Sequence, residues 1–151
     1  MIELRFARAE DAPRILQFIQ ALASYEREPN AVRVSEEQLR NQLSEPRPPF
    51  ECLLADYSAQ PAGFALFFPT YSTWLGRPGL WLEDLFVLPE LRQHGVGRAL
   101  LRKLAELAAA RGCGRLEWSV LDWNQQAIDV YEHLGARADQ GGWTTYRWSP
   151  S

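Results

Sequence analysis

The sequence has little of what metal chemistry requires. Two cysteines and two histidines, Cys52, Cys113, His94 and His133, occur in 151 residues. They do not have the close spacing that metal ligands show along a chain. Each cysteine lies beside an apolar, strand-like run, so we interpret both as buried or half-buried thiols. We therefore predict no metal site, and a domain of this size buries enough surface to fold without metal or disulfide.

A basic surplus and long apolar runs are also absent. The formal net charge is -3, which argues mildly against a nucleic-acid binder and is compatible with a cationic substrate. No stretch approaches the roughly 18 apolar residues of a membrane helix. The N-terminal residues Met-Ile-Glu-Leu-Arg-Phe lack the apolar region of a signal peptide. We expect a cytoplasmic protein without nucleic-acid or membrane partners.

The first half of the chain alternates between strand and helix periodicity. Residues 2–8 alternate apolar and polar side chains, as in a half-buried strand, whereas residues 11–26 repeat apolar positions on one helical face. Ser35 to Gln38 fits a capping box that begins a short second helix. Residues 51–56 and 62–69 are typical of a hairpin, and residues 80–88 form the most apolar strand, which we predict to be central.

The second half continues this pattern. A helix is predicted to about Arg111, then a strand over 115–121, a short helix over 124–134 and two short strands within 136–148. No internal repeat or long linker divides the chain. We therefore predict one domain over residues 1–151, of the α/β class, with helices packed against a sheet.

The strongest chemical signal is the turn Arg92-Gln93-His94-Gly95-Val96-Gly97, between a strand and a helix. The first amides of a helix lack partners and carry partial positive charge, and glycines allow a phosphate to approach the backbone. These features predict a pyrophosphate seat to which Arg92 and Arg98 add charge. The turn lacks the Lys-Ser or Lys-Thr of a P-loop and the third glycine of a dinucleotide fold. From spacing alone, a purely structural glycine turn remains an alternative.

Several further motifs occur in a fixed order. They are Y-E at 25–26, W-L-E-D-L-F-V at 81–87, D-W-N at 122–124, V-Y-E-H-L-G-A at 130–136 and G-W at 142–143. Together with R-Q-H-G-V-G, the chain resembles the GNAT N-acetyltransferases, and more narrowly their diamine (spermidine/spermine) branch. The resemblance implies the GNAT fold, with a mixed, mostly antiparallel central sheet flanked by helices. It also implies acetyl-CoA as co-substrate and a homodimer.

The resemblance assigns residues to the acetyl-CoA site. Backbone groups of the central strand would meet the pantetheine arm, backbone amides of the glycine turn would hold the pyrophosphate, and the following short helix would contact the cofactor arm and sulfur. The residues implied are Leu85, Phe86, Val87, Arg92, Gln93, His94, Gly95, Val96, Gly97, Arg98, Asn124, Ala127 and Tyr131.

The reaction requires a base and an acid. An alkyl amine has a pKa of about 10.4 and must lose a proton before it attacks the thioester. We expect Glu83 to act as the base through a water and Tyr131 to protonate the leaving thiolate. No covalent enzyme intermediate is required, so neither cysteine is assigned as a nucleophile. In a regular strand Glu83 and Asp84 would face opposite sides of the sheet, and a bulge would change this.

The amine site is predicted from the same resemblance. Tyr25 and Glu26 match substrate positions, and Glu83, Asp84 and Trp118 are further candidates for its wall. Glu26 would attract the distal ammonium of a polyamine, a diamine or a lysine-like amino acid. Two alternatives stay open: acetylation of a protein or peptide, and a non-catalytic domain that senses acetyl-CoA.

Overall fold

The structure is a computed structural model that describes residues 1–139 and 141–150, in two compact units, Met1–Ser119 and Val120–Ser151. The first unit holds the sheet and most helices. Its elements are β1 (Ile2–Phe6), the 3-10 turn η1 (Ala9–Asp11), α1 (Ala12–Tyr25), α2 (Glu36–Leu43), β2 (Glu51–Tyr57), β3 (Gln60–Ser72), β4 (Arg77–Val87), the 3-10 turn η2 (Pro89–Leu91), α3 (Val96–Ala110) and β5 (Leu116–Trp118). The second unit contains α4 (Gln125–His133).

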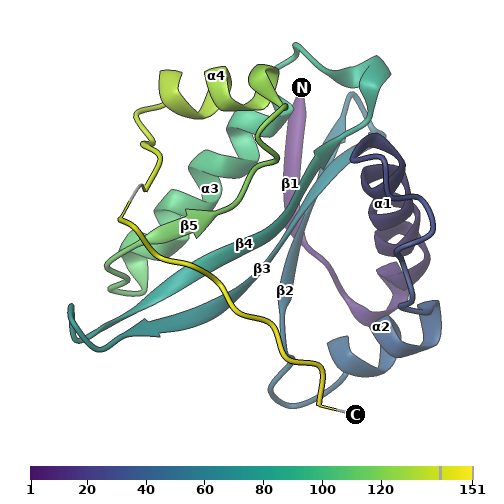
Figure 1. Ribbon diagram of the computed structural model, residues 1–151. Helices are drawn as coiled ribbons and strands as arrows, with labels where there is room; N and C mark the ends of the chain where they lie inside the picture. Colours follow the sequence, from purple (N-terminus) through teal and green to yellow (C-terminus); the bar gives the residue numbers. More distant parts are fainter. Residues whose placement is uncertain (140, 151) are drawn as a thin grey trace. The chain divides into compact units, whose positions relative to one another are not determined.

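The five strands form one sheet in the order β1-β2-β3-β4-β5 (Figure 1). The first three pairings are antiparallel, and β5 runs parallel to β4. This confirms the predicted mixed, mostly antiparallel sheet. Strand β4 lies between β3 and β5, as expected for the most apolar strand.

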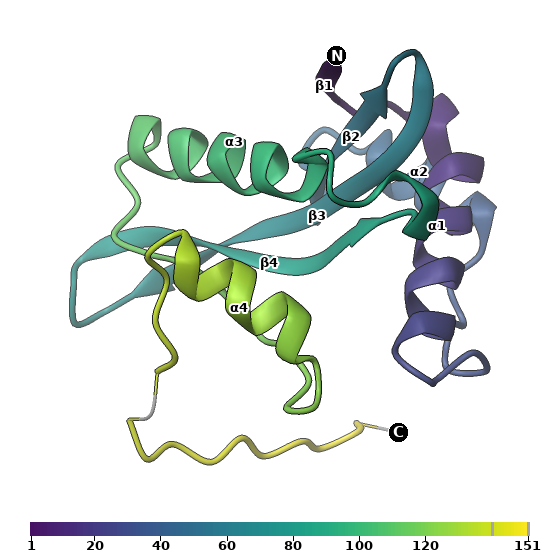
Figure 2. The same cartoon turned by 90° about the horizontal axis from the view of Figure 1, so that it is seen from above.

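Helices cover both faces of the sheet in the first unit (Figure 2). The face under α1 and α2 buries Ile15 and Phe18 of α1 with Phe64 and Phe86 of the sheet, and the rings of Phe18 and Phe64 stack at 5.4 Å. The other face lies against α3, whose Val96, Leu100 and Leu104 are buried at its apolar stripe. Alternation of side chains along each strand supplies both faces. We call these the α1 face and the α3 face.

The hairpins differ in their agreement with the sequence pattern. The turn between β2 and β3 is tight, with Ser58 and Ala59 both at positive φ, 48° and 67°, as a two-residue hairpin turn requires. The hairpin of β3 and β4 is longer than expected, because pairing continues as far as Ser72 and Arg77. Several of its outer residues, Pro69, Tyr71, Arg77 and Pro78, are exposed, so this part lacks the buried apolar run by which a strand is recognised.

Two strands predicted within residues 136–148 are wrong for the described part of that segment, which contains no strand. The prediction rested on Gly141-Gly142 as a hairpin turn, yet Trp143, Tyr146 and Trp148 after it are 79%, 91% and 91% exposed. A strand exists only where a neighbouring strand pairs its backbone groups. The strand predicted over 115–121 is also shorter, because β5 pairs with β4 at three residues.

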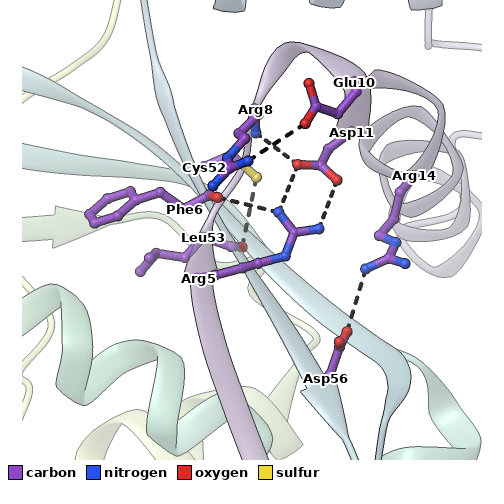
Figure 3. A network of polar contacts seen from close by, with 9 residues as sticks. All are labelled: Arg5, Phe6, Arg8, Glu10, Asp11, Arg14, Cys52, Leu53 and Asp56. Carbon is purple, nitrogen blue, oxygen red and sulfur yellow. Dashed lines mark hydrogen bonds and ion pairs between the residues drawn. The ribbon is translucent and has the colours of Figure 1, made fainter.

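A charged network ties β1 to the start of α1 (Figure 3). Arg5 donates two hydrogen bonds of 2.8 Å to the Asp11 carboxylate, which also accepts the Arg8 backbone N–H at 2.7 Å. Nearby, Arg14 of α1 pairs with Asp56 of β2 at 3.4 Å. The hydrogen bonds from Arg5 lower the pKa of Asp11 to about 2. The bidentate pair therefore fixes how the chain passes from strand to helix.

We predict that Asp11→Asn lowers the free energy of unfolding at pH 7 by about 1–2 kcal/mol, an effect reduced because Arg5 is half exposed. Because the pKa of Asp11 is lowered on folding, its contribution is present above pH 4 and is lost as the pH falls toward 2. Urea unfolding at pH 7, 4 and 3 measures this difference. Glu10→Gln is the matched control, since the Glu10–Arg8 pair spans 3.9 Å and is largely exposed. An equal loss in both variants would contradict the role of Asp11.

Candidate active site

Strand β4 carries a β-bulge at Glu83. Leu66 pairs with Asp84 and its neighbour Phe67 pairs with Leu82, so Glu83 is an extra residue. Asp84 therefore shares the face of Leu66, which belongs to the core under α1. The Glu83 carboxylate accepts a hydrogen bond of 3.0 Å from the Trp81 indole. Trp81 pairs with Phe68, which also packs on that core, so both carboxylates lie toward the α1 face.

Glu26 at the end of α1 completes a group of three interacting carboxylates. The pKa of Asp84 is raised to about 6, mainly by burial and in smaller part by the negative charges of Glu83 and Glu26. Burial and the charge of Glu83 likewise raise the pKa of Glu26. We call Glu26, Glu83 and Asp84 the acidic cluster. A cluster of this kind attracts cations, and a carboxylate with a pKa near neutrality is suited to accept a proton from an ammonium group.

The structure therefore brings together Tyr25, Glu26, Glu83 and Asp84, which the sequence proposed for one site. It also distinguishes the two β4 carboxylates. Glu83 is exposed and bonded to Trp81, whereas Asp84 is half-buried and has the raised pKa. Trp118 ends β5 opposite Leu82, the residue before the bulge. The roles of all these residues in catalysis stay predictions.

Arg92, the first residue of the glycine turn, makes contacts that the sequence did not predict. Its guanidinium carbon lies 4.6 Å from the centroid of the Tyr25 ring and 5.4 Å from that of Phe86, and its Nε donates a hydrogen bond of 2.9 Å to the Val87 carbonyl. A contact of this side chain with a pyrophosphate stays a prediction. In the structure the side chain lies against two aromatic rings and is hydrogen-bonded to the end of β4.

The glycine turn has the backbone geometry of an anion seat. Gly95 is the N-cap of α3 with φ 85°, and Gln93 is left-handed with φ 66°. The next amides, of Val96, Gly97 and Arg98, lie in the first turn of a helix that begins at Val96, where N–H groups have no partner within the helix. They carry the positive end of the helix dipole. The turn is therefore competent to bind a phosphate group.

Residues at and near the glycine turn differ in how closely they pack against the sheet. His94 stacks on Tyr57 of β2 with ring centroids 4.6 Å apart. A Cβ added to Gly97 would lie 3.7 Å from the Val87 side chain, an ordinary contact, so the fold itself does not require glycine there. By contrast, a Cβ at Gly63 of β3 would lie 2.3 Å from the Phe86 carbonyl. The close β3–β4 approach therefore requires Gly63.

The predicted pantetheine strand, Leu85, Phe86 and Val87, follows the bulge. Strand β5 pairs with β4 at Leu80, Trp81 and Leu82, so the three residues extend beyond that pairing. Backbone groups on such a strand edge bind an extended amide-bearing ligand in the way a neighbouring strand would. The geometry fits the expected arm, and the contact itself stays a prediction.

The second unit holds the remaining predicted residues. Asn124 is the N-cap of α4, and its side chain accepts a hydrogen bond of 3.3 Å from the Ala127 backbone N–H. Tyr131 lies two turns into that helix, and its carbonyl accepts from the Ala136 amide at 3.1 Å, where the helix ends. The helix itself agrees with the predicted range of 124–134.

Other features bear on alternative chemistry. Cys52 is buried in the core, and burial raises the pKa of its thiol, which keeps it protonated and unreactive. Among the residues that the structure describes, no group of three or more His, Cys, Asp or Glu side chains is placed to hold a metal ion. No helix in this described part is both long enough and apolar enough to cross a membrane.

Trp81 and the aromatic contacts of Arg92 were missed by the sequence analysis. The Trp81–Glu83 hydrogen bond could have been predicted from the sequence, because residues two apart in a strand share a face of the sheet. The contact of Arg92 with Tyr25 had none, since the two residues come from distant elements and meet only when α1 packs on β4.

Comparison with known proteins gives a consistent result. Residues 14–136 match the family described as "Acetyltransferase (GNAT) family". The chain is 39% identical to the thialysine N-epsilon-acetyltransferase of Sus scrofa, over 95% of this chain and 90% of that protein. It is 31% identical to the spermidine/spermine N(1)-acetyltransferase-like protein 1 of Homo sapiens, over 97% of this chain and 22% of that protein. An integron cassette protein of V.cholerae shares the fold, with a TM-score of 0.79 at 24% identity over 98% of this chain and 92% of that one.

We predict that Asp84→Asn raises the free energy of unfolding at pH 8 by about 1–3 kcal/mol, because the native state no longer holds a charge in a half-buried site. The pKa of Asp84 is raised on folding, from 3.8 to about 6, so the cost of its charge begins as the pH rises through 4 and is complete above about pH 6. Near pH 3 the carboxyl group is mostly protonated in both states, and the cost is small. Urea unfolding at pH 3 and pH 8 measures the gain. Exposed Glu90 provides the control variant Glu90→Gln. A gain that is the same at both pH values would contradict the electrostatic cause.

Proposed function

The chain belongs to the GNAT acetyltransferase family, and on that premise we propose that it acetylates a primary amine of a small cation with acetyl-CoA. The acceptor is a polyamine, a diamine or a lysine-like amino acid. The observation that carries this proposal is the acidic cluster of Glu26, Glu83 and Asp84, three carboxylates at the end of α1 and on β4 that interact with one another. Burial, with a further contribution from the neighbouring negative charges, raises the pKa of Glu26 and of Asp84. The named activities of the relatives, on thialysine and on spermidine/spermine, support the same class.

Acetyl-CoA would bind along β4 and the glycine turn. The α3 N-terminus from Val96 to Arg98 would hold the pyrophosphate, and Leu85 to Val87 would pair with the pantetheine arm. Asn124, Ala127 and Tyr131 of α4 would serve the cofactor arm and its sulfur. The second unit would then belong to the same functional domain, residues 1–151.

The reaction follows from these groups. A carboxylate of β4 takes a proton from the ammonium group, directly or through a water. Asp84 fits this role beside Glu83, since its raised pKa lets it accept and release protons near neutrality. The amine nitrogen then bonds to the thioester carbonyl carbon, and backbone donors stabilise the oxyanion. The C–S bond breaks, and Tyr131 gives its proton to the leaving thiolate. The nitrogen then loses its second proton, which returns through solvent to the Tyr131 oxygen, and the neutral amide remains.

A homodimer in the cytoplasm is the remaining part of the proposal. Its support, for the dimer, is the family resemblance. Light scattering of the purified protein tests the dimer directly. A monomer at micromolar concentration would reject it.

Release of CoA across a panel of amines tests the substrate class. The panel contains spermidine, putrescine, thialysine, lysine, a monoamine such as butylamine, and short peptides with a free N-terminus. A dication is expected to be the best substrate. A peptide as best substrate would favour the protein-acetylating alternative, and binding of acetyl-CoA without turnover of any amine would favour the sensor.

Glu26→Gln is predicted to raise KM for a dication by roughly 3- to 10-fold, because one of the carboxylates that attract the distal ammonium loses its charge. KM for butylamine should change little, since it has no second charge. Glu28→Gln is the matched control, because Glu28 is exposed and lies only two residues away. An equal rise in KM for the monoamine and the dication would show that the Glu26 carboxylate does not bind the distal ammonium group.

Gly97→Ala is predicted to keep the fold and weaken acetyl-CoA binding by about tenfold. The new methyl group meets Val87 at an ordinary distance, yet it projects from the first turn of α3 where the pyrophosphate would approach. Thermal unfolding and KM for acetyl-CoA are measured together. S-acetylpantetheine, which lacks the pyrophosphate, provides the control and should be used equally well by both proteins. An unchanged KM for acetyl-CoA would contradict the proposal that the pyrophosphate binds at this turn.

A further inference from the structure

Arg92 joins three parts of the first unit that the proposed reaction needs. The ring of Tyr25, at the end of α1, lies 4.6 Å from its guanidinium carbon, and the ring of Phe86 in β4 lies 5.4 Å from it. The two rings also contact each other, with centroids 6.3 Å apart and planes inclined by 60°. The Nε–H group is bonded to the Val87 carbonyl at 2.9 Å. The cation is therefore held by helix, strand and turn together.

These contacts define where the side chain can act. A guanidinium group is planar, so it can lie against an aromatic face and still donate an in-plane hydrogen bond from Nε. A lysine ammonium has no counterpart to Nε and cannot make both contacts from the same position. The half-buried bond to Val87 ties Arg92 to the last residue of β4. The geometry accordingly selects arginine for a reason other than its charge toward a phosphate.

The consequence for the amine site runs through Tyr25. Tyr25 is the last residue of α1, and Glu26, the next residue, belongs to the acidic cluster. Fixing the Tyr25 ring against Arg92 and Phe86 fixes the end of α1 over β4, and with it the place from which Glu26 faces Glu83. Val87, on the other side of the contact, is the end of the strand proposed to bind pantetheine.

We propose that Arg92 is a positioning residue that locks the end of α1 onto β4, so that the first residue of the glycine turn serves the amine site and not the pyrophosphate. This inference rests on the proposed acetylation of a small cationic amine. The backbone amides that follow it in the turn keep the phosphate role. Arg92 thus connects the two substrate sites without touching the reacting atoms.

The variants Arg92→Lys and Arg92→Gln test the inference with two acetyl donors, acetyl-CoA and S-acetylpantetheine. Both variants should raise KM for the best amine by about five- to tenfold with either donor. The dissociation constant for CoA, measured by calorimetry, should stay within about twofold of the wild-type value. A dissociation constant raised tenfold or more, with normal amine KM when S-acetylpantetheine is the donor, would make Arg92 a phosphate ligand and overturn the proposal.

A double-mutant cycle of Arg92→Lys with Tyr25→Leu tests the contact without any turnover. In thermal unfolding, the double variant should lose little more stability than the more affected single variant, because both changes remove one shared contact. Strictly additive losses would overturn the locking role. If the wild-type protein acetylates no amine of the panel, the proposed function fails, while the CoA affinities and this cycle still report on Arg92.

Discussion

The bulge at Glu83 is the constraint on which the arrangement of the first unit depends. Before the bulge, Leu80 and Leu82 are buried but lie outside the core under α1, whereas after it Phe86 belongs to that core. One extra residue thus switches the even-numbered side chains of β4 from one face of the sheet to the other. A regular strand would have placed Asp84 with Leu82, on the face that α3 covers. The bulge instead directs Asp84 toward the end of α1.

This placement has an energetic cost that the fold does not remove. A half-buried carboxylate beside two others is less stable in its charged form, which is the physical content of the raised pKa of Asp84. In a purely structural site a neutral residue of similar shape would be more stable. Carboxylates that lower the stability of the folded protein are expected where their charge serves binding or proton transfer. By contrast, the bidentate pair of Arg5 with Asp11 stabilises the charged carboxylate, which is why the pKa of Asp11 is lowered.

The proposed acetyl-CoA site combines two kinds of recognition. The glycine turn offers backbone amides at a helix N-terminus, which need no particular side chain apart from small residues nearby. The strand after the bulge offers a backbone edge. Both would use backbone groups, and in the structure the Arg92 side chain contacts Tyr25, Phe86 and the Val87 carbonyl. The proposed amine site would instead depend on side chains, and so on the register that the bulge sets in β4.

Local pattern was sufficient for much of this protein. Period and capping residues placed α1, α2, α3 and α4 within a few residues, and the glycine turn was found from the helix that it begins. The GNAT motifs identified the family because they recur in short contiguous segments. Tertiary structure alone decided the bulge, the engagement of Arg92 by Tyr25 and Phe86, the length of the β3–β4 hairpin and the lack of strands in the described part of 136–148. These depend on pairing and packing between segments far apart in the chain, where a single-residue shift in register reverses which side chains meet.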